Sequence, residues 1–286
     1  MAREKPPVRR RPDIRHKETI LKVKERVGWW FMLPFGVLSV FAFVELFLKA
    51  SIHGSLLSSS ECLCFLLGAG VWVTVFAWLR AKFAILYVFA HEMTHIISAL
   101  LCGAVIYDWH VGSNGGWVDT NKSNTFISLS PYVVPFYTII VLLGFGIAGL
   151  FTDFSHWHSV HLGSVEIPLN SSKILHYLVG LTWAFHLSFT LAVMRDEQGD
   201  LVRNGQFFSV WLIALMNLYL IICFLIIASP NLFWSDVWGC FGDLVTGVFG
   251  GLYYGFAWVG NQAWAEGQDM LNLARHWHGP STPAIP

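Results

Sequence analysis

Phe83 to Leu101 reads Phe-Ala-Ile-Leu-Tyr-Val-Phe-Ala-His-Glu-Met-Thr-His-Ile-Ile-Ser-Ala-Leu-Leu, an apolar segment with the pattern H-E-x-x-H at its centre. Two histidines four residues apart, His91 and His95, share one face of a helix and can hold a zinc ion, while the adjacent Glu92 can take a proton from water at the metal. Ionisable side chains inside a membrane are costly without a strong partner, so they indicate a functional site. The pattern therefore predicts a bound Zn²⁺ ion as that partner.

The composition predicts a membrane protein. Of the 286 residues, 55% are hydrophobic and only 13% are charged, whereas about a quarter of the residues of a soluble domain are charged. The net charge is zero, but ten of the 18 Lys and Arg residues lie within residues 1–26. A basic segment beside a membrane is attracted to anionic lipid. Attraction to the membrane explains the basic N-terminal segment, and nothing else in the sequence indicates nucleic-acid binding.

Apolar segments long enough to cross a bilayer recur along the chain. A hydrocarbon core of about 30 Å needs roughly 20 apolar helical residues. Six segments meet this requirement: 29–49, 62–80, 83–106, 126–150, 172–194 and 206–228. Residues 236–260 are also apolar and aromatic, but they contain two aspartates and many glycines. Three alternatives are kept for these residues: a seventh span, a re-entrant segment or an interfacial helix.

These segments predict an all-α polytopic membrane protein with six or seven transmembrane helices. Residues 1–28 form a basic, cytoplasmic-type N-terminal segment, and residues 29–228 form a transmembrane metalloprotease-like domain. Residues 229–286 form an aromatic, glycine-rich, membrane-associated segment and tail. The expected location is the cytoplasmic (inner) membrane of a prokaryote.

The orientation in the membrane is left open by the charges. A cytoplasmic basic head, with every segment crossing, places loops 107–125 and 195–205 outside. Yet these two loops carry three Lys and Arg residues, and residues 151–171 carry none. This distribution points to the opposite orientation, which requires that either 29–49 or 62–80 does not cross.

Residues 107–125 predict a small β-hairpin between the H-E-x-x-H helix and the next helix. The loop contains Asn114, Gly115 and Gly116 between β-prone runs, which is typical of hairpin turns. An edge strand here can pair with an unwound substrate, which makes these three residues candidates for substrate binding. A simple connector is the alternative. Ser130-Pro131 fits an N-cap followed by proline at the first position of the next helix.

The order of these features resembles the site-2 protease family of intramembrane zinc metalloproteases, over roughly residues 83–210. The helix of that family runs H-E-x-x-H, then a small residue, then glycine, then a glycine-rich hairpin. Here Ala99, Gly103 and the Gly115-Gly116 pair follow His95 in that order. The resemblance implies that His91 and His95 are zinc ligands, that Glu92 is the general base, and that the substrate is a membrane-spanning or membrane-tethered protein.

The third zinc ligand of that family is the aspartate of an Asp-Gly pair, and here the sequence departs from the pattern. No Asp-Gly pair occurs. The nearest equivalent is Asp200, which follows a glycine and is the preferred third ligand, with Asp196 and His186 as alternatives. For His186, an interhelical hydrogen bond with Thr182 or Thr190 explains the residue equally well.

The expected function is therefore that of an intramembrane zinc metalloendopeptidase, which hydrolyses a peptide bond of membrane-spanning proteins. A catalytically inactive relative that serves as a structural subunit of a membrane complex is one alternative, and it implies further partners in that complex. A transporter that uses buried histidines is the second. In that transporter the histidines would handle protons or metal ions. A purely structural role, in which His91 and His95 are core residues hydrogen-bonded between helices, is a further alternative.

Overall fold

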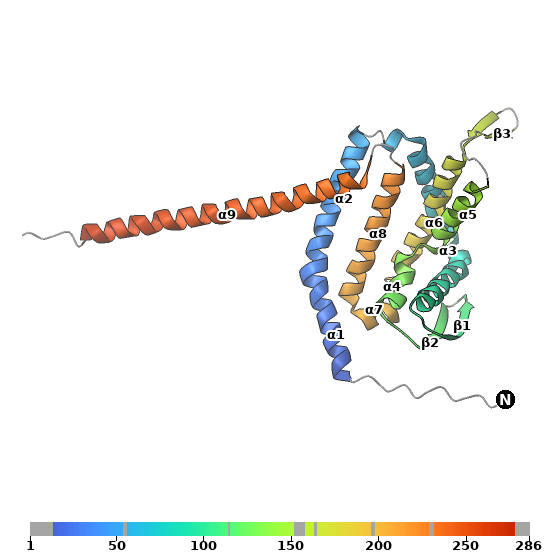
Figure 1. The fold of residues 1–286 in the computed structure, drawn as a ribbon, viewed down its shortest axis with the longest axis horizontal. Helices are drawn as coiled ribbons and strands as arrows, with labels where there is room; N and C mark the ends of the chain where they lie inside the picture. The colour runs from blue at the N-terminus through green and yellow to red at the C-terminus, as the bar shows by residue number, and fades with distance from the viewer. Residues whose placement is uncertain are drawn as a thin grey trace, which may run out of the picture. The chain divides into compact units, whose positions relative to one another are not determined.

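The computed structural model describes residues 14–53, 56–113, 115–151, 158–162, 165–195, 198–228 and 232–277. The chain divides into two compact units, Met1–Trp234 and Ser235–Pro286. The first unit is a bundle of helices with two small hairpins, and the second is built on one long helix (Figure 1).

The N-terminal helices run into one another without a break. Helix α1 (Ile14–Val27) leads through a π-helical turn, η1 (Gly28–Met32), into α2 (Leu33–His53). The basic segment expected at 1–28 is thus helical from Ile14 onward. Gly28 permits the close approach of a neighbour, because a Cβ there would lie 2.9 Å from the ring of Phe207. A short 3₁₀ turn, η2 (Leu56–Ser58), follows α2.

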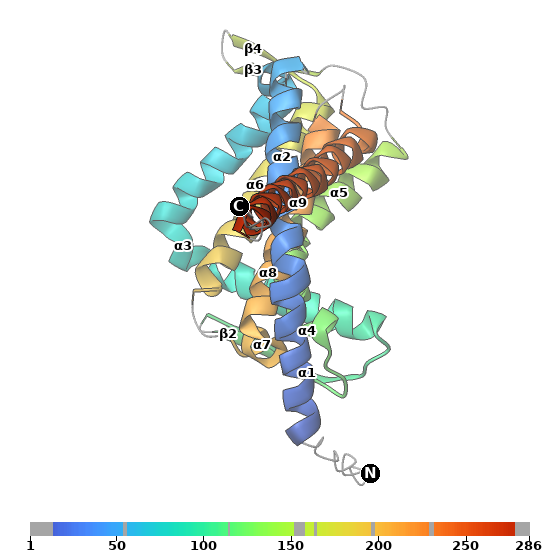
Figure 2. The same cartoon turned by 90° about the vertical axis from the view of Figure 1, so that its left-hand side faces the viewer.

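Helix α3 (Ser60–Leu101) contains both segments that were expected as separate helices, 62–80 and 83–106. That expectation was wrong, because Arg80, Ala81 and Lys82 are all good helix formers and both cations point to the exposed surface. With 42 residues, the helix is about 63 Å long, twice a bilayer core. Figure 2 shows that it changes direction along its length. It ends at Leu101, short of 106, because Gly103 takes a φ of 63°.

The predicted hairpin follows α3. Strands β1 (Ile106–Gly112) and β2 (Gly115–Thr120) pair antiparallel, with Gly112 opposite Gly115. The hairpin prediction is confirmed, although Asn114 at its tip lies outside the described residues.

Two short helices at an angle occupy the segment expected as one helix at 126–150. They are α4 (Thr125–Val133) and α5 (Phe136–Gly149), and they bend by 73° at the break. The prediction that Ser130-Pro131 starts the helix was wrong. The cap is Asn124, whose side chain accepts a hydrogen bond from the Ile127 amide, so Pro131 lies inside α4 and Pro135 precedes α5.

The rest of the first unit contains a second hairpin and three helices. Strands β3 (His158–Leu162) and β4 (Val165–Leu169) form a hairpin that the sequence did not predict. Helices α6 (Ser171–Val193) and α8 (Gln206–Ala228) lie where they were expected, and the short α7 (Gly199–Asn204) lies between them.

Helices α3 and α6 cross in close contact at a pair of glycines. A Cβ at Gly68 would collide with the Tyr177 carbonyl, and a Cβ at Gly180 would collide with that of Phe65. Small residues at such crossings let helix backbones approach each other. The crossing fixes α6 against the helix that carries the H-E-x-x-H pattern.

Among the described residues, four helices are long and apolar enough to cross a membrane. The bent pair α4–α5 raises the number to five if it counts as one span. Helix α9 (Trp234–Trp277), which holds residues 236–260, is not among them. The first unit therefore has the length and hydropathy of a polytopic membrane domain, and the expected number of six or seven spans stays a prediction.

Candidate metal centre

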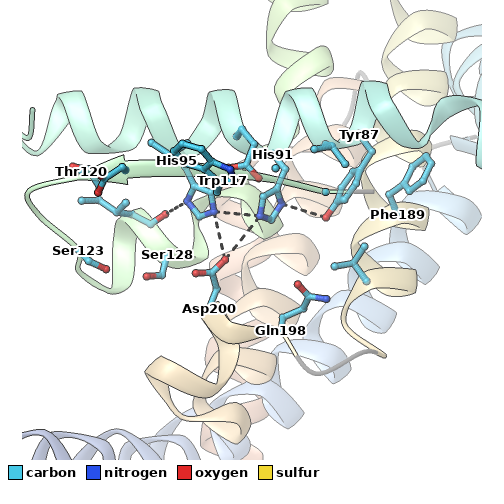
Figure 3. Close-up of a pocket in the computed structure, with 18 of the residues that line it drawn as sticks. Tyr87, His91, His95, Trp117, Thr120, Ser123, Ser128, Phe189, Gln198 and Asp200 are labelled. Atoms are coloured by element: carbon cyan, nitrogen blue, oxygen red, sulfur yellow. Dashed lines mark hydrogen bonds and ion pairs between the residues drawn. The ribbon is translucent and has the colours of Figure 1, made fainter. Parts of the chain in front are cut away.

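Three side chains from two elements converge on one point. His91 and His95 project from the same face of α3, with their Nε2 atoms 3.2 Å apart. The Asp200 Oδ2 atom of α7 lies 3.4 Å from the His95 Nε2 atom and 3.9 Å from that of His91 (Figure 3). Among the described residues this is the single group of three or more potential ligands close enough to share a metal ion.

The donor set and its spacing fit zinc. Two imidazole nitrogens and one carboxylate oxygen are ligands that zinc accepts, with bonds near 2.0–2.2 Å. Tetrahedral bonds of that length place neighbouring ligand atoms roughly 3.3–3.6 Å apart. The separations of 3.2, 3.4 and 3.9 Å are close to this value. Three protein ligands leave one position open, as in catalytic zinc sites.

The other ring nitrogens are held so that the Nε2 atoms can act as ligands. The Nδ1 atom of His95 lies 2.8 Å from the Ile127 carbonyl oxygen. Because a carbonyl can only accept, this nitrogen carries a proton, so in the neutral ring the His95 Nε2 atom has a lone pair for a metal. The Nδ1 atom of His91 lies 3.3 Å from the Tyr87 hydroxyl, whose oxygen can accept a hydrogen bond from the protonated nitrogen in the same way.

The Ile127 carbonyl is open to His95 because of Pro131. In an α-helix this carbonyl would accept from the amide of residue 131, but proline has no N–H group. The oxygen instead accepts from His95 and from the Ser130 hydroxyl, which lies at 3.1 Å. Pro131, expected at a helix start, thus orients a candidate ligand from inside α4.

Asp200 is held at the first turn of α7. The next residue, Leu201, is 2% exposed and packs in a core with Tyr132 and Ile213, so the start of α7 is anchored. Burial by itself would raise the pKa of the Asp200 carboxyl. Hydrogen bonds and charge interactions with His91 and His95 outweigh burial and lower this pKa, which keeps the carboxylate ionised, as a metal ligand must be.

Glu92 lies beside the group, beneath the hairpin. The side chain is buried, at 5% exposed, and it packs against Gly116 of β2. A Cβ at Gly116 would lie 2.5 Å from the Glu92 Cγ atom and 2.8 Å from its Oε1 atom. The absence of a side chain at Gly116 is what gives the Glu92 carboxylate its room.

A cavity of about 730 Å³ opens onto these groups. Its walls include His91, Glu92, His95 and Asp200, together with every residue of β2 from Gly115 to Thr120. Ligand-binding cavities have volumes in this range. The cavity is therefore large enough to hold a ligand, and one whole strand of the hairpin borders it.

The alternatives for the third ligand fare differently. His186 is buried in α6 outside the three-residue group, and its Nε2 atom has no hydrogen-bond partner among the described residues. Neither expected threonine pairs with it. Thr182 bonds to Thr138 and the Thr190 hydroxyl has no partner there. Asp196 and Asn114 lie outside the described residues.

Replacing Gly116 is expected to disable Glu92 while sparing the metal ligands. In Gly116→Ala the new methyl group overlaps the Glu92 side chain and the His110 carbonyl oxygen, so one of them must move. If Glu92 is the general base that the sequence predicts, peptide cleavage should fall at least tenfold with zinc content unchanged, because a displacement of about 1 Å can cost on the order of 100-fold in rate. Cleavage rate and bound zinc are measured on the same preparation.

The matched control is Gly112→Ala in the other strand. Its Cβ would lie 3.1 Å from the tip of the His110 ring, which can turn away, and 3.4 Å from the Gly115 carbonyl oxygen, an ordinary van der Waals distance. Equal losses of activity in the two variants would contradict the role given to Gly116.

Several residues at this site were not predicted from the sequence, and only one of them carries a signal there. Tyr87 stands four residues before His91, so helical spacing alone indicates that the two can meet. The contact of the Ile127 carbonyl with His95 and the packing of Gly116 on Glu92 depend on the tertiary fold.

Comparison with protein-family models, with curated proteins and with solved structures finds no match for this chain.

Proposed function

We propose that this protein is an intramembrane zinc endopeptidase that cleaves membrane-spanning protein substrates. The observation that carries the proposal is the convergence of the His91, His95 and Asp200 donor atoms beside Glu92 in a cavity bordered by β2. The resemblance of residues 83–210 to the site-2 protease family supports the same reading.

The chemistry follows from the positions of the side chains. His91, His95 and Asp200 would hold the ion, and a bound zinc ion lowers the pKa of water and polarises a carbonyl group. Glu92 accepts the proton of the attacking water as its oxygen bonds to the peptide carbon. Glu92 then returns this proton to the amide nitrogen as the carbon–nitrogen bond breaks.

The substrate would enter as an extended strand beside β2. A transmembrane helix hides its carbonyl groups in internal hydrogen bonds, so it must unwind before cleavage. In the two-stranded sheet, β1 pairs with one edge of β2, and residues Gly115–Thr120 of β2 border the cavity. The other edge of β2 can therefore supply the backbone partners that the unwound segment needs.

The continuity of α3 supports one orientation in the membrane. If α2, α3, the α4–α5 pair, α6 and α8 each cross once, a cytoplasmic N-terminus places loops 107–125 and 195–205 in the cytoplasm as well. Their three Lys and Arg residues then lie inside, and residues 151–171, which have none, lie outside. The conflict between the basic head and the loop charges disappears, because α3 replaces two expected spans with one. Lys17, Lys22 and Arg26 would meet anionic lipid at the cytoplasmic surface.

The proposal is tested with purified protein and a fluorogenic peptide whose sequence spans a bilayer, both reconstituted in lipid bicelles. Cleavage is expected, with loss on treatment with a zinc chelator and return when zinc is added back. A set of such peptides, with and without helix-destabilising residues, should show faster cleavage where the helix unwinds. No cleavage of any peptide by zinc-loaded protein would contradict the peptidase assignment.

A further inference from the structure

Lys24 of α1 connects two elements that carry parts of the candidate metal centre. Its Nζ atom lies 2.8 Å from the Thr125 hydroxyl of α4 and 2.7 Å from the Asn204 side-chain carbonyl of α7. The ammonium group thus donates across sequence separations of 101 and 180 residues. Lys24 lies outside residues 83–210, so nothing in the H-E-x-x-H pattern or its surroundings predicts this link.

The contact with Asn204 reaches the third ligand through α7. Asn204 is 4% exposed, and its side-chain amide donates to the Asp200 carbonyl oxygen at 2.9 Å. Helix α7 has only six residues, and a helix that short is not stable by itself in water. Its shape, and with it the position of the Asp200 carboxylate, depends on contacts such as this one.

A second side chain of α1 meets α7 at the same end. Gly205, which ends α7, has a φ of 89°. A Cβ there would lie 2.6 Å from the Glu25 Oε1 atom, so Glu25 packs directly on the glycine. Two consecutive residues of α1 therefore contact the C-terminal end of the helix that carries Asp200.

The contact with Thr125 reaches the other side of the metal group. Thr125 is the first residue of α4, two residues before Ile127, whose carbonyl orients His95. One ammonium group therefore spans the start of α4 and the end of α7, the two elements that place the His95 ring and the Asp200 carboxylate.

We infer that Lys24 is a positioning residue of the metal centre, which holds α7 against α4 so that Asp200 stays within reach of His91 and His95. The inference rests on the proposed metal function and extends it to the N-terminal helix. Helix α1 is then part of the apparatus that binds the ion, although it supplies no ligand.

The test compares Lys24→Met, which keeps the length of the side chain but removes its donors, with Lys24→Arg, which keeps a cationic donor. Lys22→Met is the matched control, because Lys22 is an exposed lysine on the same helix. Zinc affinity is measured in detergent by competition with a chromophoric chelator. Outer residues that orient ligands contribute about 10–100-fold to metal affinity, so Lys24→Met should bind zinc about tenfold more weakly. Lys24→Arg should recover much of this loss, and Lys22→Met should match the wild type.

Cobalt(II) provides a readout that a merely structural role would not change. Its visible absorption reports the number and geometry of ligands, so Lys24→Met should shift the spectrum towards that of Asp200→Ala. In a double-mutant cycle, Lys24→Met should weaken zinc binding little further once Asp200 is alanine, because the two residues act through one contact path. Thermal unfolding followed by circular dichroism establishes that each variant is folded. If Lys24→Met does not fold, Thr125→Val, which removes only one acceptor, is expected to give a smaller loss of affinity.

The outcomes separate this inference from the proposed function. One outcome is that the wild-type protein binds zinc through His91 and His95, while Lys24→Met is less stable but has the same zinc affinity and cobalt spectrum. This outcome overturns the inference and leaves the proposed function standing. Fully additive effects of Lys24→Met and Asp200→Ala overturn it as well. Wild-type protein that binds neither zinc nor cobalt overturns both.

Discussion

Purified protein is expected to contain about one zinc ion per chain, and the double variant His91→Ala/His95→Ala is expected to contain none. The two Nε2 atoms, 3.2 Å apart, supply two of the three donors, and a single carboxylate does not retain zinc against a chelator. Metal is measured by elemental analysis of detergent-purified protein, with helix content checked in parallel. Zinc occupancy should also fall as the solution is made acidic, because protons compete with the metal for the same two ring nitrogens.

The matched control removes two histidines elsewhere. His110 of β1 and His176 of α6 lie outside the three-residue group, so His110→Ala/His176→Ala should keep its zinc. Within the acidic loop, Asp200→Ala should weaken zinc binding far more than Asp196→Ala, and the reverse order would make Asp196 the third ligand. Wild-type protein that is folded but free of zinc, cobalt and iron would favour a structural subunit of a membrane complex.

Glu92→Gln is expected to abolish cleavage while the protein keeps its zinc. The amide is nearly the same size as the carboxylate and fills the same space beside Gly116, but it cannot accept the proton of water. General-base catalysis contributes about 10²–10⁴-fold in rate, so turnover should fall by at least the lower figure. Initial rates on the bilayer-spanning peptide are measured together with bound zinc, so that loss of base and loss of metal are distinguished.

Glu61→Gln is the control for this change, since Glu61 lies in the first turn of the same helix, 31 positions before Glu92 along the chain. It should cleave at the wild-type rate. Unchanged cleavage by Glu92→Gln would exclude Glu92 as the base, and loss of zinc from this variant would make it a ligand.

The sequence predicted the parts of the site that depend on local spacing. His91 and His95 share a face because helices repeat every 3.6 residues, and the hairpin follows from a glycine-rich turn between β-prone runs. Asp200 was the preferred third ligand, and it lies within 3.9 Å of both histidines. The zinc role of this group and the identity of Glu92 as base remain predictions.

The parts that depend on tertiary contacts could not be predicted in this way. Hydropathy divided α3 at Arg80 and Lys82, because charged residues are typical of a membrane boundary but do not end a helix. Pro131 was expected at a helix start, where the missing amide hydrogen costs nothing. The helix instead begins six residues earlier, at the cap that Asn124 provides. The link from Lys24 to Asn204 joins residues 180 positions apart, which no local pattern reports.

The missing amide hydrogen of Pro131 gives the histidine tautomer an unusual origin. The Nδ1 atom of His95 donates its proton to a main-chain oxygen, so exchanging the side chain of Ile127 leaves that acceptor in place. A change at position 131 does the opposite, because any other amino acid introduces an N–H group that competes for the same oxygen. The orientation of the His95 ring therefore depends on Pro131, a residue of a different helix. Alanine scanning of the residues next to His95 would leave the Ile127 carbonyl oxygen in place and would miss its role.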